Sequence, residues 1–168
     1  MAYDYLAESR RLIADGLPDR PVRLSRRHRF AALAVDVDGA MAATRFVRRG
    51  VACHWDDTHV LTRGADGLWW VHGGGGGSSD GPWSTAEFER ARAELEPGAI
   101  VVEGGSGVMV PPWIQAIELL VGRDAATVRI DDRRELQVPP HGRLVVVSAE
   151  RCPQLSTHDA AGNKLAEA

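Results

Sequence analysis

The segment CHWDDTH, which begins at residue 53, holds the densest group of side chains in this sequence that could do acid–base chemistry. Successive side chains of an extended strand alternate between two faces. One face of this segment would carry His54 and Asp56, and the other would carry Trp55, Asp57 and His59. Each face then has a histidine beside a carboxylate, a pair that could orient a general base or supply two ligands to a divalent metal.

Further candidates lie downstream of this segment. His72 or Asp80 could add a third metal ligand or another acid–base group. Tryptophans are concentrated in the same part of the chain, and aromatic walls around a few polar groups are typical of a small-ligand pocket. Because Trp69 and Trp70 would point to opposite faces of a strand, at most one of them can line a given pocket. The candidate acid–base residues are His54, Asp56, Asp57, His59 and His72, and the candidate ligand contacts are Trp55, Trp70 and Trp83.

These residues also have a purely structural interpretation. Histidine and aspartate in a half-exposed strand often face solvent or pair with a neighbouring strand. The two cysteines, Cys53 and Cys152, lack the C-x-x-C spacing of a zinc site. We therefore expect no bound metal and no cofactor, and the sequence leaves open whether the two cysteines form a disulfide.

The stretch HGGGGGSSDG, residues 72–81, contains two fragments typical of hydrolases. Its HGGG resembles an oxyanion loop, and its GSSDG matches G-x-S-x-G with Ser79 as the nucleophile. In α/β-hydrolases these motifs come from different βα units of a parallel sheet, whereas here they are contiguous. A P-loop is excluded because the motif needs a lysine and the one lysine of this chain is Lys164. The glycines also lack the spacing of a dinucleotide fingerprint.

We expect instead that residues 73–83 form a flexible, glycine-rich loop between two structured parts of the chain. The alternative is a backbone surface that binds an anion or lets a ligand approach the main chain closely. If a site exists here, the glycines would form its lip, and His72 and Trp83 would form its walls.

Residues 1–72 predict a helix followed by an antiparallel meander. Apolar side chains recur at helical spacing over residues 2–15, and Gly16 and Pro18 would end that helix. The helix is too short to be stable alone, so its apolar face must pack on the rest of the domain.

Two β-prone runs flank Asp38-Gly39, a strong signal for a two-residue hairpin turn. That pairing would place Val35 and Val37 on the buried face of the hairpin. Further strands at about 51–62 and 68–72 complete a four-stranded meander, because the connections leave no room for crossover helices.

Residues 84–153 predict a second helix followed by short strands. A serine at the N-cap and a glutamate three residues later form a capping box, and the helix would extend over Thr85–Glu96. Short apolar runs separated by Gly and Pro then predict an antiparallel, sandwich-like lobe. The polar tail, 154–168, is expected to be flexible. The predicted fold class is mainly β (α+β): an antiparallel meander plus β-sandwich-like strands with two short helices, in one compact unit.

Composition limits the classes of function. The chain has 168 residues and a net charge of −3, which does not indicate a nucleic-acid-binding protein. Of its 20 basic residues only Lys164 is a lysine, a bias typical of a GC-rich, bacterial genome. Apolar runs fall well short of the ~20 residues of a membrane span, and the N-terminus lacks the pattern of a signal peptide. We expect a soluble, cytoplasmic protein that binds neither nucleic acid nor membrane.

Our first hypothesis for the function is a β-rich binding or protein-interaction module without catalysis, whose partner is an unidentified protein or small molecule. A sheet edge could also pair with a second copy of the chain to give a homo-oligomer. The alternative is a small hydrolase or cyclase that uses a His/Asp acid–base pair in a Trp-lined pocket. The enzyme needs its His and Asp to converge in a concave pocket, whereas the module needs an apolar patch or an exposed sheet edge.

Overall fold

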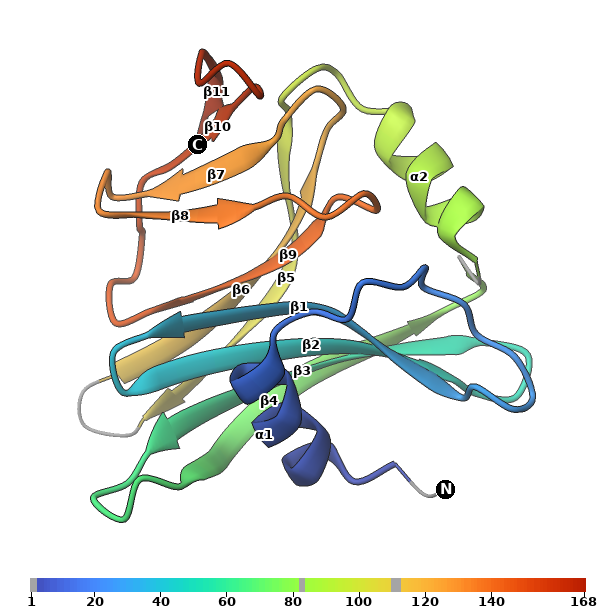
Figure 1. Ribbon diagram of the computed structural model, residues 1–168, viewed down its shortest axis with the longest axis vertical. Coiled ribbons are helices and arrows are strands. Elements are labelled where there is room, and N and C mark those ends of the chain that lie inside the picture. Colours follow the sequence, from blue (N-terminus) through green and yellow to red (C-terminus); the bar gives the residue numbers. More distant parts are fainter. Residues whose placement is uncertain (1–2, 82–83, 110–112) are drawn as a thin grey trace.

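The computed structural model describes residues 3–81, 84–109 and 113–168, which form a mainly β structure (Figure 1). Its helices are α1 (Tyr5–Asp15) and α2 (Thr85–Ala93). Its strands are β1 (Phe30–Asp38), β2 (Met41–Arg49), β3 (His54–Arg63), β4 (Trp69–Ser79), β5 (Ile100–Met109), β6 (Trp113–Val121), β7 (Thr127–Ile130), β8 (Arg134–Gln137), β9 (Arg143–Ser148), β10 (Leu155–His158) and β11 (Lys164–Glu167). The predicted fold class, mainly β with few helices, is confirmed.

Within the described residues, the strands form three antiparallel sheets. The N-terminal sheet has the order β1-β2-β3-β4, which is the predicted meander. The central sheet has the order β5-β6-β9, and the C-terminal sheet has the order β11-β10-β7-β8. The central sheet lies between the other two sheets (Figure 1).

The central sheet is apolar on both faces. Ile114 and Ala116, on one face of β6, pack on Ala43 and Val60 of the N-terminal sheet. Leu119, on the opposite face, packs on the C-terminal sheet. A strand that is covered on both faces is apolar at nearly every position, which explains runs such as WIQAIELLV and RLVVVS.

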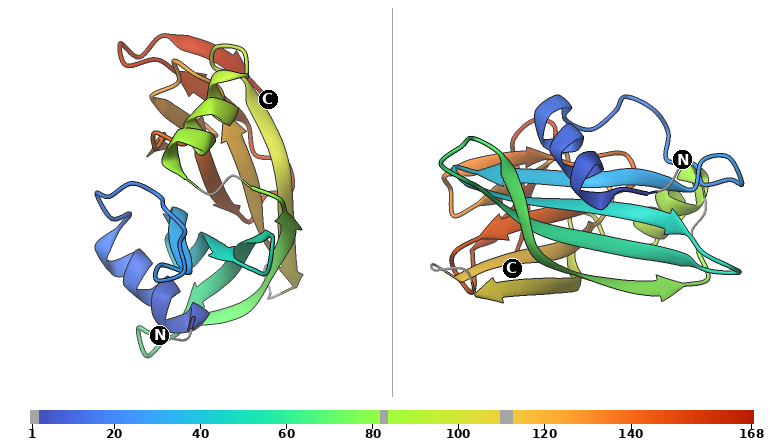
Figure 2. Two further views of the ribbon diagram at one scale, coloured as in Figure 1. Left: turned by 90° about the vertical axis from the view of Figure 1, so that its right-hand side faces the viewer. Right: turned by 90° about the horizontal axis from the view of Figure 1, so that it is seen from below.

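The outer face of the N-terminal sheet is covered by α1 (Figure 2). The carboxylate of Asp4 caps this helix by accepting the N–H groups of Leu6 and Ala7, at 3.1 Å each. On the side that faces the sheet, the buried Ser9 hydroxyl lies 2.8 Å from Thr44 Oγ1. Neither described helix is long and apolar enough to cross a membrane.

The first hairpin differs from the prediction by one residue. Its turn lies at residues 39–40 rather than 38–39. This moves the pairing by two residues and leaves the same side chains together on each face. The predicted choice of the buried face is wrong near the turn, because Val37 is exposed and Asp36 is buried against the central sheet. There the Asp36 carboxylate accepts the N–H of Val147 at 2.8 Å, a hydrogen bond that connects the two sheets.

The predicted glycine-rich loop at 73–83 is wrong over its first part, because β4 continues through the glycines and pairs with β3 along their whole length. Close packing explains the glycines. A Cβ on Gly74 would lie 2.1 Å from the carbonyl oxygen of Thr58, and a Cβ on Gly75 would lie 3.2 Å from the Cβ of Ser106 in β5. Glycine is therefore needed here for close approach of the strands and not for mobility.

We expect Gly74→Ala to lower the free energy of unfolding by about 1–3 kcal/mol, the usual cost of overpacking, because the methyl group would clash with the Thr58 carbonyl. Gly77→Ala is the matched control, since no described atom lies within 4 Å of the position of its Cβ. The control is expected to be neutral or stabilising by up to about 1 kcal/mol, because alanine restricts the unfolded chain. Urea denaturation compares the two variants, and equal effects would contradict the packing explanation.

The C-terminal segment 154–168 is not the predicted flexible tail, because it forms β10 and β11 at one edge of the C-terminal sheet. Leu155 is buried in the core between this sheet and the central sheet. The Thr157 hydroxyl donates to the carbonyl of Gly98 at 2.6 Å, which connects the segment to the loop between α2 and β5.

Helix α2 begins at the predicted position and ends at Ala93, earlier than predicted. Its N-cap residue, Ser84, donates to the carboxylate of Glu87 at 2.8 Å and makes no side-chain hydrogen bond to the helix backbone. Phe88 is the buried residue of this helix and packs with apolar side chains of β1 and β2. Trp83, a candidate ligand contact, lies outside the described residues.

Candidate functional site

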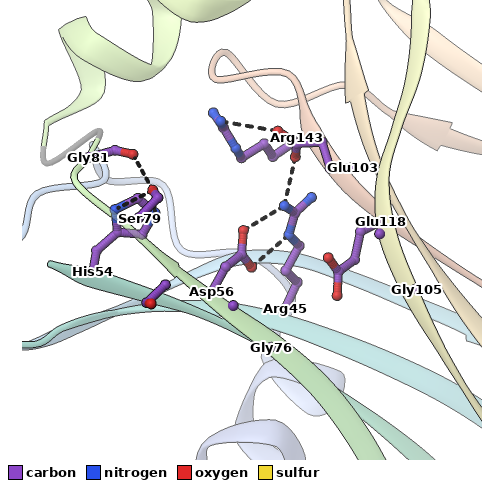
Figure 3. A pocket seen from close by; sticks show the side chains of 13 residues that line it. Arg45, His54, Asp56, Gly76, Ser79, Gly81, Glu103, Gly105, Glu118 and Arg143 are labelled. Carbon is purple, nitrogen blue, oxygen red and sulfur yellow. Dashed lines mark hydrogen bonds and ion pairs between the residues drawn. The ribbon is translucent and has the colours of Figure 1, made fainter.

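A cavity of about 350 Å³ lies between the N-terminal sheet and the central sheet (Figure 3). This volume falls in the range of about 300–1,000 Å³ that is typical of small-molecule sites. One wall is mostly backbone, because glycines of β4 and β5 form it. The charged and titratable side chains of the lining are Arg45, His54, Asp56, Glu103, Glu118 and Arg143.

Three of the lining side chains point toward the cavity because successive side chains of a strand alternate between its two faces. Arg45 on β2, and His54 and Asp56 on β3, lie on the face of the N-terminal sheet that faces the central sheet. Glu103 reaches the cavity in another way. The residues on either side of it pair with β6, and Glu103 is the extra residue of a β-bulge, a feature that redirects side chains.

Arg45 holds the ionic network of the cavity together, and it is only 1% exposed. Its Nε and Nη2 donate to the two carboxylate oxygens of Asp56 at 2.9 and 2.6 Å, and Nη2 also donates to Glu103 at 2.7 Å. Its Nη1 donates to the carbonyls of Leu119 and Leu144 at 3.2 Å each. A guanidinium has five N–H donors, so none is left for a ligand. Burial opposes the charge, but Asp56 and Glu103 raise the pKa of Arg45 above its ordinary value.

Arg143, in contrast, has a donor without a partner. Its Nη2 donates to Glu103 Oε1 at 3.2 Å, and its guanidinium carbon lies 4.7 Å from the ring centroid of Phe88. Its Nη1 is buried and makes no hydrogen bond within the part of the chain that the structure describes. An unsatisfied buried donor costs about 1–3 kcal/mol. Burial lowers the pKa of Arg143, and Glu103 opposes that shift. Arg143 is thus held by Glu103 and Phe88, while both N–H bonds of its buried Nη1 lack an acceptor among the described residues.

Glu118 is the acid of the cavity that lacks a basic partner. It is a buried residue of β6, and the ion pairs between described residues do not include it. Burial raises the pKa of its carboxyl group, while the Thr58 hydroxyl and the positive charge of Arg45 oppose that shift. An acceptor of this kind is suited to a hydrogen-bond donor or a cation on a ligand.

His54 contacts Ser79, the serine of the G-x-S-x-G fragment. Ser79 Oγ lies 3.3 Å from both ring nitrogens of His54, and the same hydroxyl donates to the carbonyl of Gly81 at 2.7 Å. A hydroxyl has one proton and a carbonyl can only accept, so His54 acts as the donor toward Ser79. Burial lowers the pKa of His54, against the attraction of Asp56, which favours the neutral form of the ring.

The other candidates on β3 lie on the opposite face of the sheet, under the N-terminal segment. Tyr3 Oη lies 3.1 Å from His59 Nε2, and burial lowers the pKa of His59. Asp57 forms an ion pair with Arg48, whose guanidinium lies 5.3 Å from the ring centroid of Tyr3. Trp55 is also on this face, 41% exposed and 5.9 Å from the same guanidinium. The two His/Asp pairs are therefore separated by the sheet, and only His54 and Asp56 line the cavity.

His72 and Trp70 do not line this cavity either. A register shift between β3 and β4 lies next to His72, which is exposed and 2.6 Å from the Thr62 hydroxyl. Trp70 is 47% exposed, and the guanidinium of Arg10 lies 5.4 Å from its ring centroid. Trp55 and Trp70 are therefore not brought to this cavity, where glycine backbone forms the wall instead.

Four charged residues of the lining were not among the predicted site residues, and they come from four different strands: Arg45, Glu103, Glu118 and Arg143. One signal was available. Arg45 and Glu118 each interrupt an apolar stretch that is buried on both faces. Because a buried charge is costly unless it is paired, such interruptions predict partners elsewhere in the fold.

Among the described residues, no group of three or more His, Cys, Asp or Glu could hold a metal ion. Cys53 and Cys152 are free, which answers the open question about a disulfide. Comparison of the chain with models of protein families, with curated proteins and with solved structures finds no match. The function must therefore be argued from the geometry of the cavity.

Proposed function

We propose that this protein binds a small polar molecule in the cavity between the N-terminal and central sheets, without catalysing a reaction on it. The observation that carries the proposal is the Nη1 of Arg143, a buried donor beside a cavity of ligand size, with no acceptor among the described residues. Unsatisfied buried polar groups are rare in folded proteins and each calls for an explanation, which a bound molecule would supply here.

The ionic network around this donor supports the same function. Arg143, Glu103, Arg45 and Asp56 form one continuous chain of alternating charges (Figure 3). Buried ion pairs contribute little to stability compared with apolar side chains of similar volume. A fixed polar framework is, however, what a binding site needs to hold a ligand with little loss of conformational freedom.

The glycine wall adds a further reason. Gly76 and Gly77 of β4 and Gly104 and Gly105 of β5 border the cavity. Without side chains, these residues let a ligand lie directly against the main chain. Ligand approach to the backbone was the alternative interpretation of the glycine run, and the cavity makes it the preferred one.

A small hydrolase is the second candidate, because His54, Asp56 and Ser79 all border the cavity. A serine nucleophile must give its proton to the imidazole. Here the Ser79 proton is directed to the carbonyl of Gly81, so the hydrogen bonds favour binding over catalysis.

The test is a thermal-shift screen with amino acids, mono- and dicarboxylic acids and sugars, followed by calorimetry. We expect at least one compound to raise Tm, and Arg143→Met to weaken its binding by at least about tenfold, the value of one charged hydrogen bond. Arg129→Met, at an exposed ion pair with Glu135, is the control and should bind normally. Equal binding by the Arg143→Met variant would contradict the proposal. Turnover that Ser79→Ala abolishes would favour the hydrolase.

A further inference from the structure

The cavity holds two polar groups of opposite charge that the described residues leave incompletely paired. One is the Nη1 of Arg143, a buried donor without a described acceptor in a residue that is 8% exposed. The other is the carboxyl group of Glu118, a buried acceptor outside the ion pairs of the described residues. In Figure 3 these two groups lie on different sides of Arg45.

The charges of the lining do not balance. Two arginines, Arg45 and Arg143, face three carboxyl groups, from Asp56, Glu103 and Glu118, which leaves one excess negative charge when all are ionised. Arg45 joins Asp56 to Glu103, and Arg143 binds the second oxygen of Glu103. The excess charge therefore belongs to Glu118.

We propose that the ligand is a zwitterion, an amino acid in the broad sense, whose carboxylate binds Arg143 and whose ammonium group binds Glu118. This inference rests on the proposed binding function and specifies its ligand. With Glu118 ionised, a carboxylate alone would add a second excess negative charge to the cavity. An amine alone would leave the Nη1 of Arg143 without an acceptor. A zwitterion satisfies both groups and leaves the net charge of the cavity unchanged.

The hydrogen bonds of the other charged residues support this assignment. Arg45 cannot bind the carboxylate, because its five N–H groups are already used. Both oxygens of Asp56 accept hydrogen bonds from Arg45, and each oxygen of Glu103 accepts one from an arginine. Glu118 is thus the carboxyl group best able to accept an ammonium group. Its raised pKa agrees, because a cation would stabilise the ionised form that burial disfavours.

Calorimetry with a series of linear ω-amino acids, from glycine to 6-aminohexanoate, tests the proposal on the wild-type protein. Each compound is compared with the carboxylic acid and with the primary amine of the same chain length. We expect one length to bind best, and to bind about 10- to 100-fold more tightly than either single-charged analogue, because one charged hydrogen bond is lost in each analogue.

Two variants test the two proposed contacts of the ligand separately. Glu118→Gln should abolish the advantage of the amino acid over the carboxylic acid, and Arg143→Met should abolish its advantage over the amine. Equal affinities of wild-type protein for amino acids and carboxylic acids would overturn the zwitterion while leaving the binding function intact. If neither these compounds nor the wider screen binds, the binding function itself fails. The length series needs no variant, so it decides the question even if a variant does not fold.

Discussion

Arg45→Met is expected to lower the free energy of unfolding by about 3–5 kcal/mol, the usual result of removing one partner from a buried ion pair. Arg45 is 1% exposed and donates hydrogen bonds to Asp56, to Glu103 and to the carbonyls of Leu119 and Leu144. The variant would leave two carboxylates without their shared cation and two carbonyls without their donor. Urea denaturation followed by circular dichroism measures the loss.

Arg129→Met is the matched control for Arg45→Met. Arg129 also bonds to a carboxylate, at 3.0 Å from Glu135, but both side chains are at least 40% exposed. An exposed ion pair contributes about 0–1 kcal/mol, so this variant should change stability little. Adding Asp56→Asn to Arg45→Met should recover part of the loss, because it removes one uncompensated charge. A loss of unfolding free energy no larger than that of the control would show that the ion pairs of Arg45 do not stabilise the fold.

His141 is expected to make the protein less stable by about 3 kcal/mol as pH falls from 6.5 to 4. Burial, and next the positive charge of Arg143, lower the pKa of His141 from 6.5 to about 4, and its Nδ1 accepts the N–H of Arg143 at 3.1 Å. Above pH 6.5 the imidazole is neutral in both the folded and the unfolded chain. Between pH 6.5 and pH 4 the unfolded chain binds a proton that the folded chain excludes, so stability falls as pH falls. Below pH 4 this contribution becomes constant.

His141→Gln isolates this effect from the other titrating groups. Its free energy of unfolding, measured by urea denaturation from pH 8 to pH 4, should fall less steeply than that of the wild type between pH 6.5 and pH 4. The difference between the two curves should approach the loss given above, since one pKa unit corresponds to about 1.4 kcal/mol. Parallel curves would assign the acid sensitivity to other groups, such as His54 or His59, whose pKa values are also lowered.

Sequence patterns within single strands, turns and helices predicted the general architecture well. Alternation and turn signals gave the meander, and the N-terminal signals of α2 placed its start correctly. The glycine segment of β4 could not be predicted in the same way, because glycine is unfavourable in isolated strands. What makes it a strand is the close approach of Thr58 on one side and of Ser106 on the other. The contact with Ser106 forms only after β5 has packed on β4, and helix α2 separates these two strands in the sequence.

The candidate site was predicted in part. Alternation correctly paired His54 with Asp56 and separated them from Asp57 and His59. It could not identify their partners, because Glu103 and Arg143 come from β5 and β9 of the central sheet, which are distant in the sequence. In particular, a bulge directs Glu103 into the cavity, and local sequence does not specify where a bulge forms.

The glycine segment of β4 also has a consequence for how the chain finds its pairing. Five consecutive identical residues without side chains cannot distinguish one alignment against β3 from the next, so their own interactions leave the register undetermined. The residues at the two ends of the glycine segment must therefore fix the register. At one end, Trp69 pairs with Arg63, Trp70 with Thr62 and Val71 with Leu61. At the other end, Ser79 pairs with His54. Misaligned hairpins shifted by a residue should therefore be the characteristic folding errors of this protein.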